Sequence, residues 1–276
     1  MRLKFSKMHG LGNDFMVLDL VTQHLDLDPE LISAWGDRHT GVGFDQLLAV
    51  LPPENPDMDF QYRIFNADGS EAQQCGNGLR CFARFVADNQ LSPKETLRIE
   101  SLAGALWTRH IDRDQVEVGM GVPVTEPQRI PLISEAPGPT HEFEVDGERI
   151  ELTAVSMGNP HGVLFVDNVQ MADVSGLGPR LERHERFPER ANIGFCQVVD
   201  PGFARLRVFE RGVGETRACG TGACAAVVAG RLLGKFNQRV KVSLPGGKLR
   251  IYWPGPGEEL TMTGPATLVY EGVILI

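Results

Sequence analysis

The sequence has no apolar run long enough to cross a membrane and no concentration of basic residues. A membrane-spanning helix needs about 20 mostly apolar residues in succession, and no such run occurs in the 276 residues. Acidic residues outnumber basic ones by 36 to 27, which disfavours nucleic acid and anionic lipid as partners because both are bound by clustered Lys and Arg. The first residues, MRLKFSKMHGLGNDF, also lack the apolar core of a secretory signal. We therefore expect a cytoplasmic protein that binds neither nucleic acid nor membrane.

Cysteine is scarce and odd in number, with five residues at positions 75, 81, 196, 219 and 224. An odd count without an export signal favours free thiols in a reducing compartment over a disulfide framework. The hydrophobic fraction of 42% and the charged fraction of 23% are close to globular averages, so the chain can build a core. Its length suits two domains of ordinary size.

One pattern occurs in both halves of the chain. Superposing Cys75 on Cys219 aligns Phe65 with Phe209, and each half then reads apolar-Phe, nine further residues, and Cys-Gly-x-Gly. Further pairs follow in the same order under a slightly shifted alignment: Asn13 with Asn159, and Gln46 with Asn192. Because the polar anchors recur in one order, we infer a duplicated domain.

A proline-rich segment, GVPVTEPQRIPLISEAPGPTHEF, separates the two halves and is typical of a crossing between domains. We predict one domain from residues 1–118 together with 264–276, and a second from residues 119–263. The C-terminal run LVYEGVILI has no counterpart at the end of the first half. We therefore expect it to return and complete the sheet of the first domain.

Short alternating or β-branched runs such as DFQYRIF, RLRVF and LRIYW fill much of the sequence, with Gly, Pro, Asn and Asp between them. This pattern is typical of many short strands. Helices are few, and the two best candidates, residues 77–89 and 221–233, directly follow cysteines. The second is apolar on nearly every side and must be buried on every side. The predicted fold is α+β, with two pseudo-symmetric domains, each a mixed β-barrel rolled around a central helix, and an active site in the cleft between them.

Cys75 and Cys219 each lie at the start of a predicted helix and are followed by Gly-x-Gly. Unpaired backbone N–H groups and the positive helix end stabilise negative charge there, which favours a thiolate. Burial in an apolar cleft would act in the opposite direction by raising the thiol pKa. The glycines let N–H groups approach a carboxylate or phosphate closely, so we expect an anionic substrate group between the helix ends.

Single-thiol chemistries explain only part of this pattern. A papain-like nucleophile or a phosphatase-like loop would use one cysteine, whereas two equivalent sites occur here. Zinc is an alternative, because the spacings from Cys75 to Cys81 and from Cys219 to Cys224 resemble paired ligands. Both second cysteines fall inside apolar helices, where cysteine commonly serves as a small hydrophobic residue, and Cys196 in IGFCQVV is expected in a core strand. We expect no metal.

Inversion of a carbon centre is a reaction that uses two equivalent acid/base groups. One group removes a proton from one face of the carbon, and the other delivers a proton to the opposite face. An amino-acid α-proton is only weakly acidic, so the charge that develops on the carboxylate must be stabilised by preorganised donors such as two helix N-termini. Two thiols on opposed half-sites fit these requirements.

Seven blocks of the sequence, in order, are MHGLGNDF, RHTGVGFDQL, FNADGSEAQQCGNGLRC, SMGNPHGV, FPERANIGF, ERGVGETRACGTGACA and MTGPATLVYEG. Together they resemble the blocks of the diaminopimelate epimerase family, from residue 8 to residue 272. The resemblance implies a PLP-independent isomerase without any cofactor, which interconverts LL- and meso-diaminopimelate in lysine and peptidoglycan-precursor biosynthesis. It also implies that the protein is a homodimer and that its binding partner is this small-molecule substrate.

The same resemblance implies roles for individual residues. Cys75 and Cys219 would be the acid/base pair, with His161 and Glu210 nearby to tune or relay protons. The reacting carboxylate would be held at the helix ends by Gly76, Asn77, Gly220 and Thr221. The other substrate-binding residues would be Asn13, Gln46, Asn66, Asn159, Asn192, Glu210 and Arg211, and Tyr270 would lie at a dimer contact.

Two other functions remain open from the sequence. A proline racemase-like enzyme also uses two cysteines on this fold, but its substrate has no second carboxylate for Arg211 to bind. A zinc or redox-switch binding protein would explain the five thiols without catalysis. The candidate loop residues also have an ordinary interpretation, because Asn is a common turn former and His161 or Glu210 could lie in a solvated loop.

Overall fold

A computed structural model describes residues 2–73, 75–134 and 138–276, and the chain divides into two compact units. Unit 1 comprises Met1–Gly119 and Thr263–Ile276, and unit 2 comprises Met120–Met262. The chain therefore passes from unit 1 to unit 2 and back again. Each unit has its own strands, its own long helix and its own buried apolar core.

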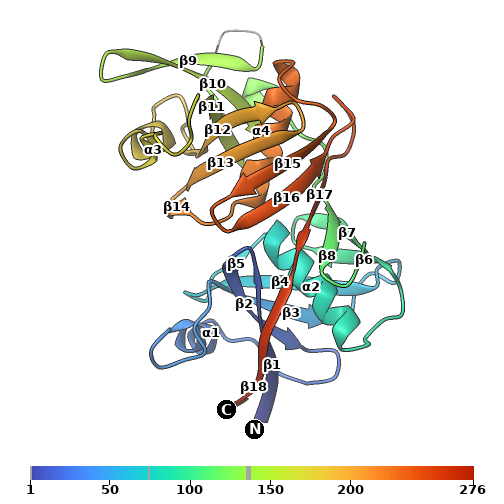
Figure 1. The fold of residues 1–276 in the computed structure, drawn as a ribbon. Helices are drawn as coiled ribbons and strands as arrows, with labels where there is room; N and C mark the ends of the chain where they lie inside the picture. The colour runs from blue at the N-terminus through green and yellow to red at the C-terminus, as the bar shows by residue number, and fades with distance from the viewer. Residues whose placement is uncertain (1, 74, 135–137) are drawn as a thin grey trace. The chain divides into compact units, whose positions relative to one another are not determined.

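Unit 1 is a mixed sheet with one long and one short helix (Figure 1). Its elements are β1 (Arg2–Gly10), β2 (Asn13–Asp19), α1 (Pro29–Gly36), β3 (Gln46–Leu51), β4 (Phe60–Asn66), β5 (Glu71–Ala72), α2 (Gly76–Asp88), β6 (Thr96–Ser101), β7 (Gly104–His110), β8 (Gln115–Gly119) and β18 (Thr267–Leu275). The strands pair in the order β18, β1, β2, β3, β4, β6, β7, β8, and β5 adds to β4. The C-terminal strand β18 lies antiparallel to β1, beside the N-terminus.

Unit 2 repeats this arrangement. Its elements are the 3-10 helix η1 (Pro127–Arg129), β9 (Thr140–Val145), β10 (Glu148–Ser156), β11 (Pro160–Phe165), α3 (Val174–Glu182), β12 (Asn192–Asp200), β13 (Phe203–Glu210), β14 (Gly214–Thr216), α4 (Gly220–Leu232), β15 (Arg239–Leu244), β16 (Gly247–Tyr252) and β17 (Thr261–Pro265), which runs across the boundary into unit 1. The strands pair in the order β9, β10, β11, β12, β13, β15, β16, with β14 added to β13. The seven strands of this row follow the same order as β18 to β7 in unit 1, and the predicted α+β class with pseudo-symmetric halves is confirmed.

The same ion pair braces the hairpin before each cysteine. Arg63 on β4 contacts Glu71 on β5 at 2.7 Å, and Arg207 on β13 contacts Glu215 on β14 at 2.7 Å. The two pairs are equivalent in the alignment that superposes the cysteines. Both are partly exposed, so each contributes no more than about 1 kcal/mol to stability. Their value lies in fixing the register of the short strand that leads into the helix.

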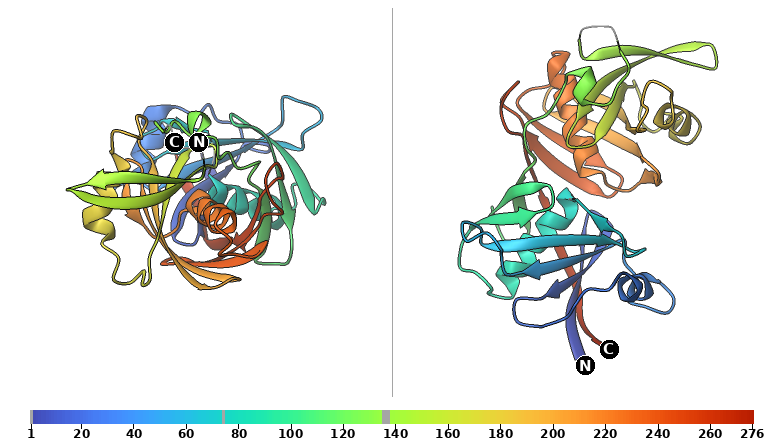
Figure 2. Two further views of the ribbon diagram at one scale, coloured as in Figure 1. Left: turned by 90° about the horizontal axis from the view of Figure 1, so that it is seen from above. Right: turned by 180° about the vertical axis from the view of Figure 1, so that it is seen from behind.

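The helices α2 and α4 begin and end one residue earlier than the sequence predicts. Cys75 and Cys219 are the N-cap residues, with extended backbones, so each helix begins at the following glycine. Helix α4 packs against β10, β11, β12, β13 and β16, and Figure 2 shows it nearly along its axis with strands of its own unit around it. Helix α2 packs in the same way against β1, β2, β3, β7 and β8. Each sheet therefore curves around one helix.

Two shorter helices, α1 and α3, were not predicted from the sequence. Helix α1 lies between β2 and β3, and α3 lies between β11 and β12. Both strand pairs are parallel, and a parallel pair needs a long crossover connection, which is commonly helical. The need for these helices follows from strand pairing, which periodicity in the sequence does not show.

Gly78 on α2 leaves room for the side chain of Tyr62, which extends from β4. A Cβ atom on Gly78 would lie 2.7 Å from the hydroxyl oxygen of Tyr62, whose side chain is buried. We expect Gly78→Ala to lower the free energy of unfolding by about 1–3 kcal/mol, because this overpacking outweighs the higher helix propensity of alanine. Urea denaturation measures the loss. Gly194→Ala is the matched control, since its Cβ would have no neighbour closer than 3.4 Å, and an equal loss in both variants would contradict the steric explanation.

Candidate active site

Each unit places a cysteine thiol at the N-terminus of its central helix. Cys75 caps α2 and is half-buried, whereas Cys219 caps α4 and is 3% exposed. The sulfur of Cys219 accepts a hydrogen bond from the Gly222 backbone N–H at 3.4 Å and lies 3.6 Å from the Thr221 hydroxyl. The first backbone N–H groups of an α-helix have no acceptor within the helix and can bind an anion.

Three predicted residues of unit 1 lie at one end of its sheet. Asn13 begins β2, Gln46 begins the parallel strand β3, and Asn66 ends the antiparallel strand β4. Gln46 pairs with Asn66 in the β-sheet register, and its Nε2 donates to Asn66 Oδ1 at 3.0 Å. Strand direction thus brings together residues that are far apart in the sequence.

The Cys75 sulfur contacts this set through Asn13. It lies 3.5 Å from Asn13 Oδ1, and the same oxygen accepts from Asn77 Nδ2 at 3.3 Å. Arg80, which is fully buried, donates to Asn77 Oδ1 at 3.0 Å. We call Asn13, Gln46, Asn66, Cys75 and Asn77 the unit 1 half-site.

Unit 2 has the equivalent arrangement at the same end of its own sheet. Asn159 precedes β11, Asn192 begins the parallel strand β12, and Glu210 ends β13. Asn192 Oδ1 accepts from the Arg211 backbone N–H at 2.9 Å, and its Nδ2 donates to a backbone carbonyl at 3.2 Å. We call Asn159, His161, Asn192, Glu210 and Cys219 the unit 2 half-site.

The Cys219 thiol is held in its protonated form. Burial raises its pKa well above the usual value, and the Glu210 carboxylate raises the pKa further. The hydrogen bonds from Thr221 and Gly222 act in the opposite direction but do not outweigh burial. Burial, the effect that the sequence analysis set against the helix terminus, therefore prevails over these hydrogen bonds at Cys219. Glu210 is itself held by a hydrogen bond from the Thr216 hydroxyl.

His161 is a buried, neutral residue and not a solvated loop residue. It is 1% exposed, pairs with Asn192 in the register of β11 and β12, and places Nε2 3.0 Å from Asn159 Oδ1. Burial, helped by the Arg211 charge, lowers its pKa to about 3. At neutral pH it can exchange hydrogen bonds in the half-site, but it carries no positive charge.

Two charged groups that hold the site loops were missed by the sequence analysis. The first is Glu182 at the end of α3, which is buried and accepts from the Gly212 backbone N–H at 2.9 Å, next to Arg211. The Arg211 side chain donates to the Glu189 carbonyl at 3.1 Å. Nothing in the local sequence marks Glu182, because the contact joins segments that are 30 residues apart.

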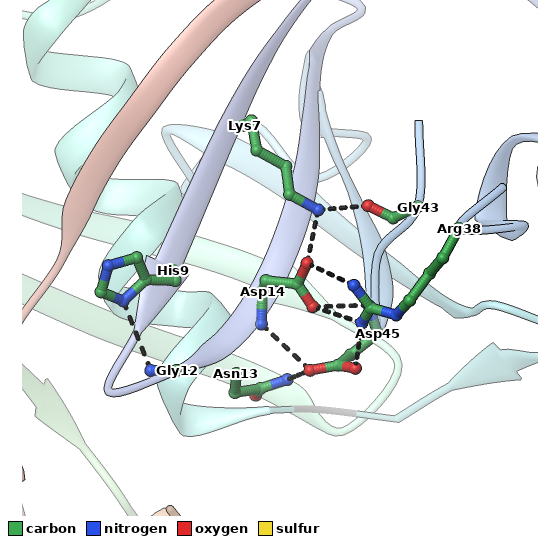
Figure 3. A network of polar contacts seen from close by, with 8 residues as sticks. All are labelled: Lys7, His9, Gly12, Asn13, Asp14, Arg38, Gly43 and Asp45. Carbon is green, nitrogen blue, oxygen red and sulfur yellow. Dashed lines mark hydrogen bonds and ion pairs between the residues drawn. The ribbon is translucent and has the colours of Figure 1, made fainter. Parts of the chain in front are cut away.

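The second missed group is an ionic network beside Asn13 (Figure 3). Asp14 contacts Lys7 Nζ at 2.5 Å and Arg38 Nη2 at 2.8 Å, and Arg38 also contacts Asp45 at 2.7 Å. Burial alone would raise the pKa of Asp14, but the hydrogen bonds from Arg38 and Lys7 hold it well below the usual range. The acidic residues in GLGND and GFDQ were the available signal, since each directly adjoins a predicted site residue.

Two of the remaining cysteines are inert thiols. Cys81 and Cys196 are fully buried, and burial raises the pKa of each to about 12. In the described part of the chain, no group of three or more His, Cys, Asp and Glu side chains could hold a metal ion. Among the same residues, no helix has the length and apolar character of a membrane span.

Comparison with known proteins decides the family. The sequence model described as diaminopimelate epimerase matches residues 5–126 and 153–269. The chain belongs to the diaminopimelate epimerase family. It is 60% identical over 274 residues to the diaminopimelate epimerase of Pseudomonas paraeruginosa, and 58% identical over 274 residues to that of Azotobacter vinelandii, in each case covering 99% of both chains.

Solved structures with much lower sequence identity share the fold. A hydroxyproline epimerase from Agrobacterium vitis superposes with a TM-score of 0.73 at 13% identity, over 99% of this chain and 92% of that chain. A phenazine biosynthesis protein of the PhzF family from Bacillus anthracis gives 0.72 at 17% identity, over the whole of both chains. At such identities the likeness extends to the fold alone. The diaminopimelate epimerase relatives are the ones that match in sequence.

The buried neutral state of His161 generates a pH prediction. Between pH 6.5 and about 3, the unfolded chain binds a proton at His161 that the folded protein does not bind, so this residue costs stability as the pH falls below 6.5. We expect His161→Gln to flatten the acid side of the stability profile by up to about 1.4 kcal/mol per pH unit. Urea denaturation between about pH 4.5 and pH 7.5 measures this slope. His39→Gln, at an exposed position, is the control, and an unchanged slope in His161→Gln would contradict the prediction.

Proposed function

We propose that this protein interconverts LL- and meso-diaminopimelate, without a cofactor, as an isomerase of lysine and peptidoglycan-precursor biosynthesis. The observation that carries the proposal is the pair of equivalent N-cap thiols, one in each unit of a duplicated fold. The full-length similarity at 60% identity to relatives named diaminopimelate epimerase supports the same substrate. Such a biosynthetic enzyme would work in the cytoplasm.

The proposed reaction moves two protons at one carbon. One cysteine first releases its proton to solvent. Its thiolate then takes the α-proton, and the electron pair of the broken C–H bond delocalises into the neighbouring carboxylate. The thiol of the other cysteine then gives its proton to the opposite face and becomes a thiolate. Because one proton is taken up and one is given, the number of protons on the enzyme is conserved in this step. The reverse reaction exchanges the roles of the two cysteines.

The half-sites suggest how the substrate is held. Backbone N–H groups at Gly76, Asn77, Gly220 and Thr221 would bind the reacting carboxylate, because a helix N-terminus stabilises an anion. The amino groups and the distal carboxylate of the substrate would be bound by side-chain amides, a carboxylate and a guanidinium. These belong to Asn13, Gln46, Asn66, Asn159, Asn192, Glu210 and Arg211. Neutral His161 would orient Asn159 and relay hydrogen bonds near Cys219.

The proposal treats unit 1 and unit 2 as the two epimerase domains. It requires the Cys75 and Cys219 sulfurs to flank one substrate carbon when ligand is bound. The two thiols would act in different surroundings, because the Glu210 carboxylate lies against Cys219, whereas Cys75 contacts the uncharged amide of Asn13.

The proposed reaction predicts that both thiols are essential. We expect Cys75→Ala and Cys219→Ala each to reduce epimerisation by about 100- to 10,000-fold, the usual contribution of a positioned acid or base, with little change in fold. Incorporation of solvent deuterium at the α-carbon of diaminopimelate measures turnover. Cys196→Ala serves as the control because that buried thiol should take no part in the reaction. Retained exchange in either site variant, or exchange with proline in place of diaminopimelate, would refute the proposal.

We also propose that the protein is a homodimer formed through β18. This strand exposes a row of apolar side chains: Leu268, Val269, Tyr270, Val273 and Leu275. Exposed apolar area of this kind is typical of a contact surface, and Tyr270 already stacks edge-on against Phe5 within its own unit.

The dimer predicts a concentration-dependent mass that one substitution shifts. We expect Tyr270→Ala to weaken association by at least about tenfold in Kd, the loss expected on truncating one anchoring aromatic side chain. Sedimentation velocity measures the mass, and Met171→Ala is the control because Met171 is an exposed apolar residue of unit 2. A wild-type chain that sediments as a monomer at all concentrations would rule out the dimer.

A further inference from the structure

Asp45 in unit 1 contacts Asn13 directly, one residue before Gln46. Its Oδ2 accepts hydrogen bonds from Asn13 Nδ2 and from the Asp14 backbone N–H, each at 3.1 Å (Figure 3). Its Oδ1 accepts from Arg38 Nη2 at 2.7 Å. A carboxylate accepts hydrogen bonds and does not donate them, so the group of Asn13 that faces Asp45 is the amide NH2.

This orientation decides what the Cys75 thiol meets. With its NH2 on Asp45, Asn13 turns Oδ1 toward the sulfur, at 3.5 Å. The buried contacts on the other side of Asn13, which involve Asn77 and Arg80, require the same orientation. Arg80 only donates hydrogen bonds and occupies Asn77 Oδ1, so the NH2 of Asn77 faces Asn13 Oδ1. The Asp45 carboxylate, which accepts, and the Arg80 guanidinium, which donates, therefore require the same arrangement of the Asn13 and Asn77 amides.

We propose that Asp45 is a positioning residue, which fixes the Asn13 amide so that its oxygen accepts a hydrogen bond from the Cys75 thiol. An acceptor stabilises S–H and does not stabilise the thiolate, so this contact holds the proton on Cys75 in the unliganded protein. The inference rests on the proposed acid/base role of Cys75. It adds Asp45, a surface carboxylate, to the groups on which that role depends.

The other ionisable groups around Cys75 do not obscure this effect when the thiol is titrated with pH. Tyr62 on β4 donates to the Cys75 carbonyl at 3.5 Å, and Arg80 and Cys81 lie on α2. Burial raises the pKa of Tyr62 well above its usual value and that of Cys81 to about 12, while arginine keeps its charge. None of the three changes charge in the pH range in which an ordinary thiol titrates.

The pH dependence of alkylation tests the proposal. In reduced, unliganded Asp45→Ala protein, Asn13 loses the anchor for its NH2, and we expect the iodoacetamide rate profile of Cys75 to move to lower pH by about one unit, the equivalent of one hydrogen bond. Mass spectrometry of the digest follows Cys75 and Cys219 together, and the Cys219 profile should not move. Epimerisation should fall about tenfold in kcat, because the thiol is less well positioned.

Two matched variants separate positioning from charge and from general stability. Arg38→Ala removes the ion pairs of Arg38 but leaves the contact between Asp45 and Asn13, so its Cys75 profile should match the wild type. Asp45→Asn keeps an oxygen that can accept from Asn13 and should restore most of the wild-type profile.

Three results would overturn the proposal: an unchanged Cys75 profile in Asp45→Ala, an equal shift in Arg38→Ala, or Asp45→Asn behaving like Asp45→Ala. Alkylation does not require turnover. A shifted profile in a protein that fails to epimerise diaminopimelate would therefore support the positioning role and refute only the proposed function.

Discussion

The candidate site in each unit depends on one arrangement: a cysteine thiol lies at the N-terminus of a helix, and the sheet of the same unit encloses that helix. Because Cys75 and Cys219 are N-cap residues with extended backbones, their sulfurs lie beside the first turns of α2 and α4, and the Cys219 sulfur accepts a hydrogen bond from the Gly222 N–H. Enclosure of the helix supplies the opposing effect, since burial favours the neutral thiol. The balance between these two effects governs the chemistry that each half-site can perform.

Close packing makes this arrangement rigid. Gly78 and Gly222 occupy equivalent positions in the two helices, and a Cβ on either would meet a side chain within about 3 Å. The ion pairs of Arg63 and Arg207 brace the hairpins that lead into the cysteines. Each thiol is therefore held by a helix that cannot slide and by a strand whose register is fixed.

The two half-sites share a backbone but differ in charge. In the alignment that superposes the cysteines, neutral Asn66 corresponds to Glu210, and the buried cation Arg80 corresponds to Cys224. Unit 2 thus has a carboxylate beside its thiol, whereas unit 1 has a guanidinium behind the amides that contact its thiol. The shared backbone accounts for the matching geometry, and the different residues at these two positions account for the electrostatic difference.

The sequence by itself determined the duplicated pattern, the α+β class and the two long helices to within one residue, and it marked the cysteines and amides as candidate site residues. These features are local, since they depend on residue periodicity, glycine placement and short motifs. Tertiary structure alone decided which groups hold them. Helices α1 and α3 follow from parallel strand pairing, the low pKa of His161 follows from burial, and the contacts of Glu182 and Asp45 join segments that are distant in the chain. Burial and long-range hydrogen bonds depend on strand register and packing, which no local pattern specifies.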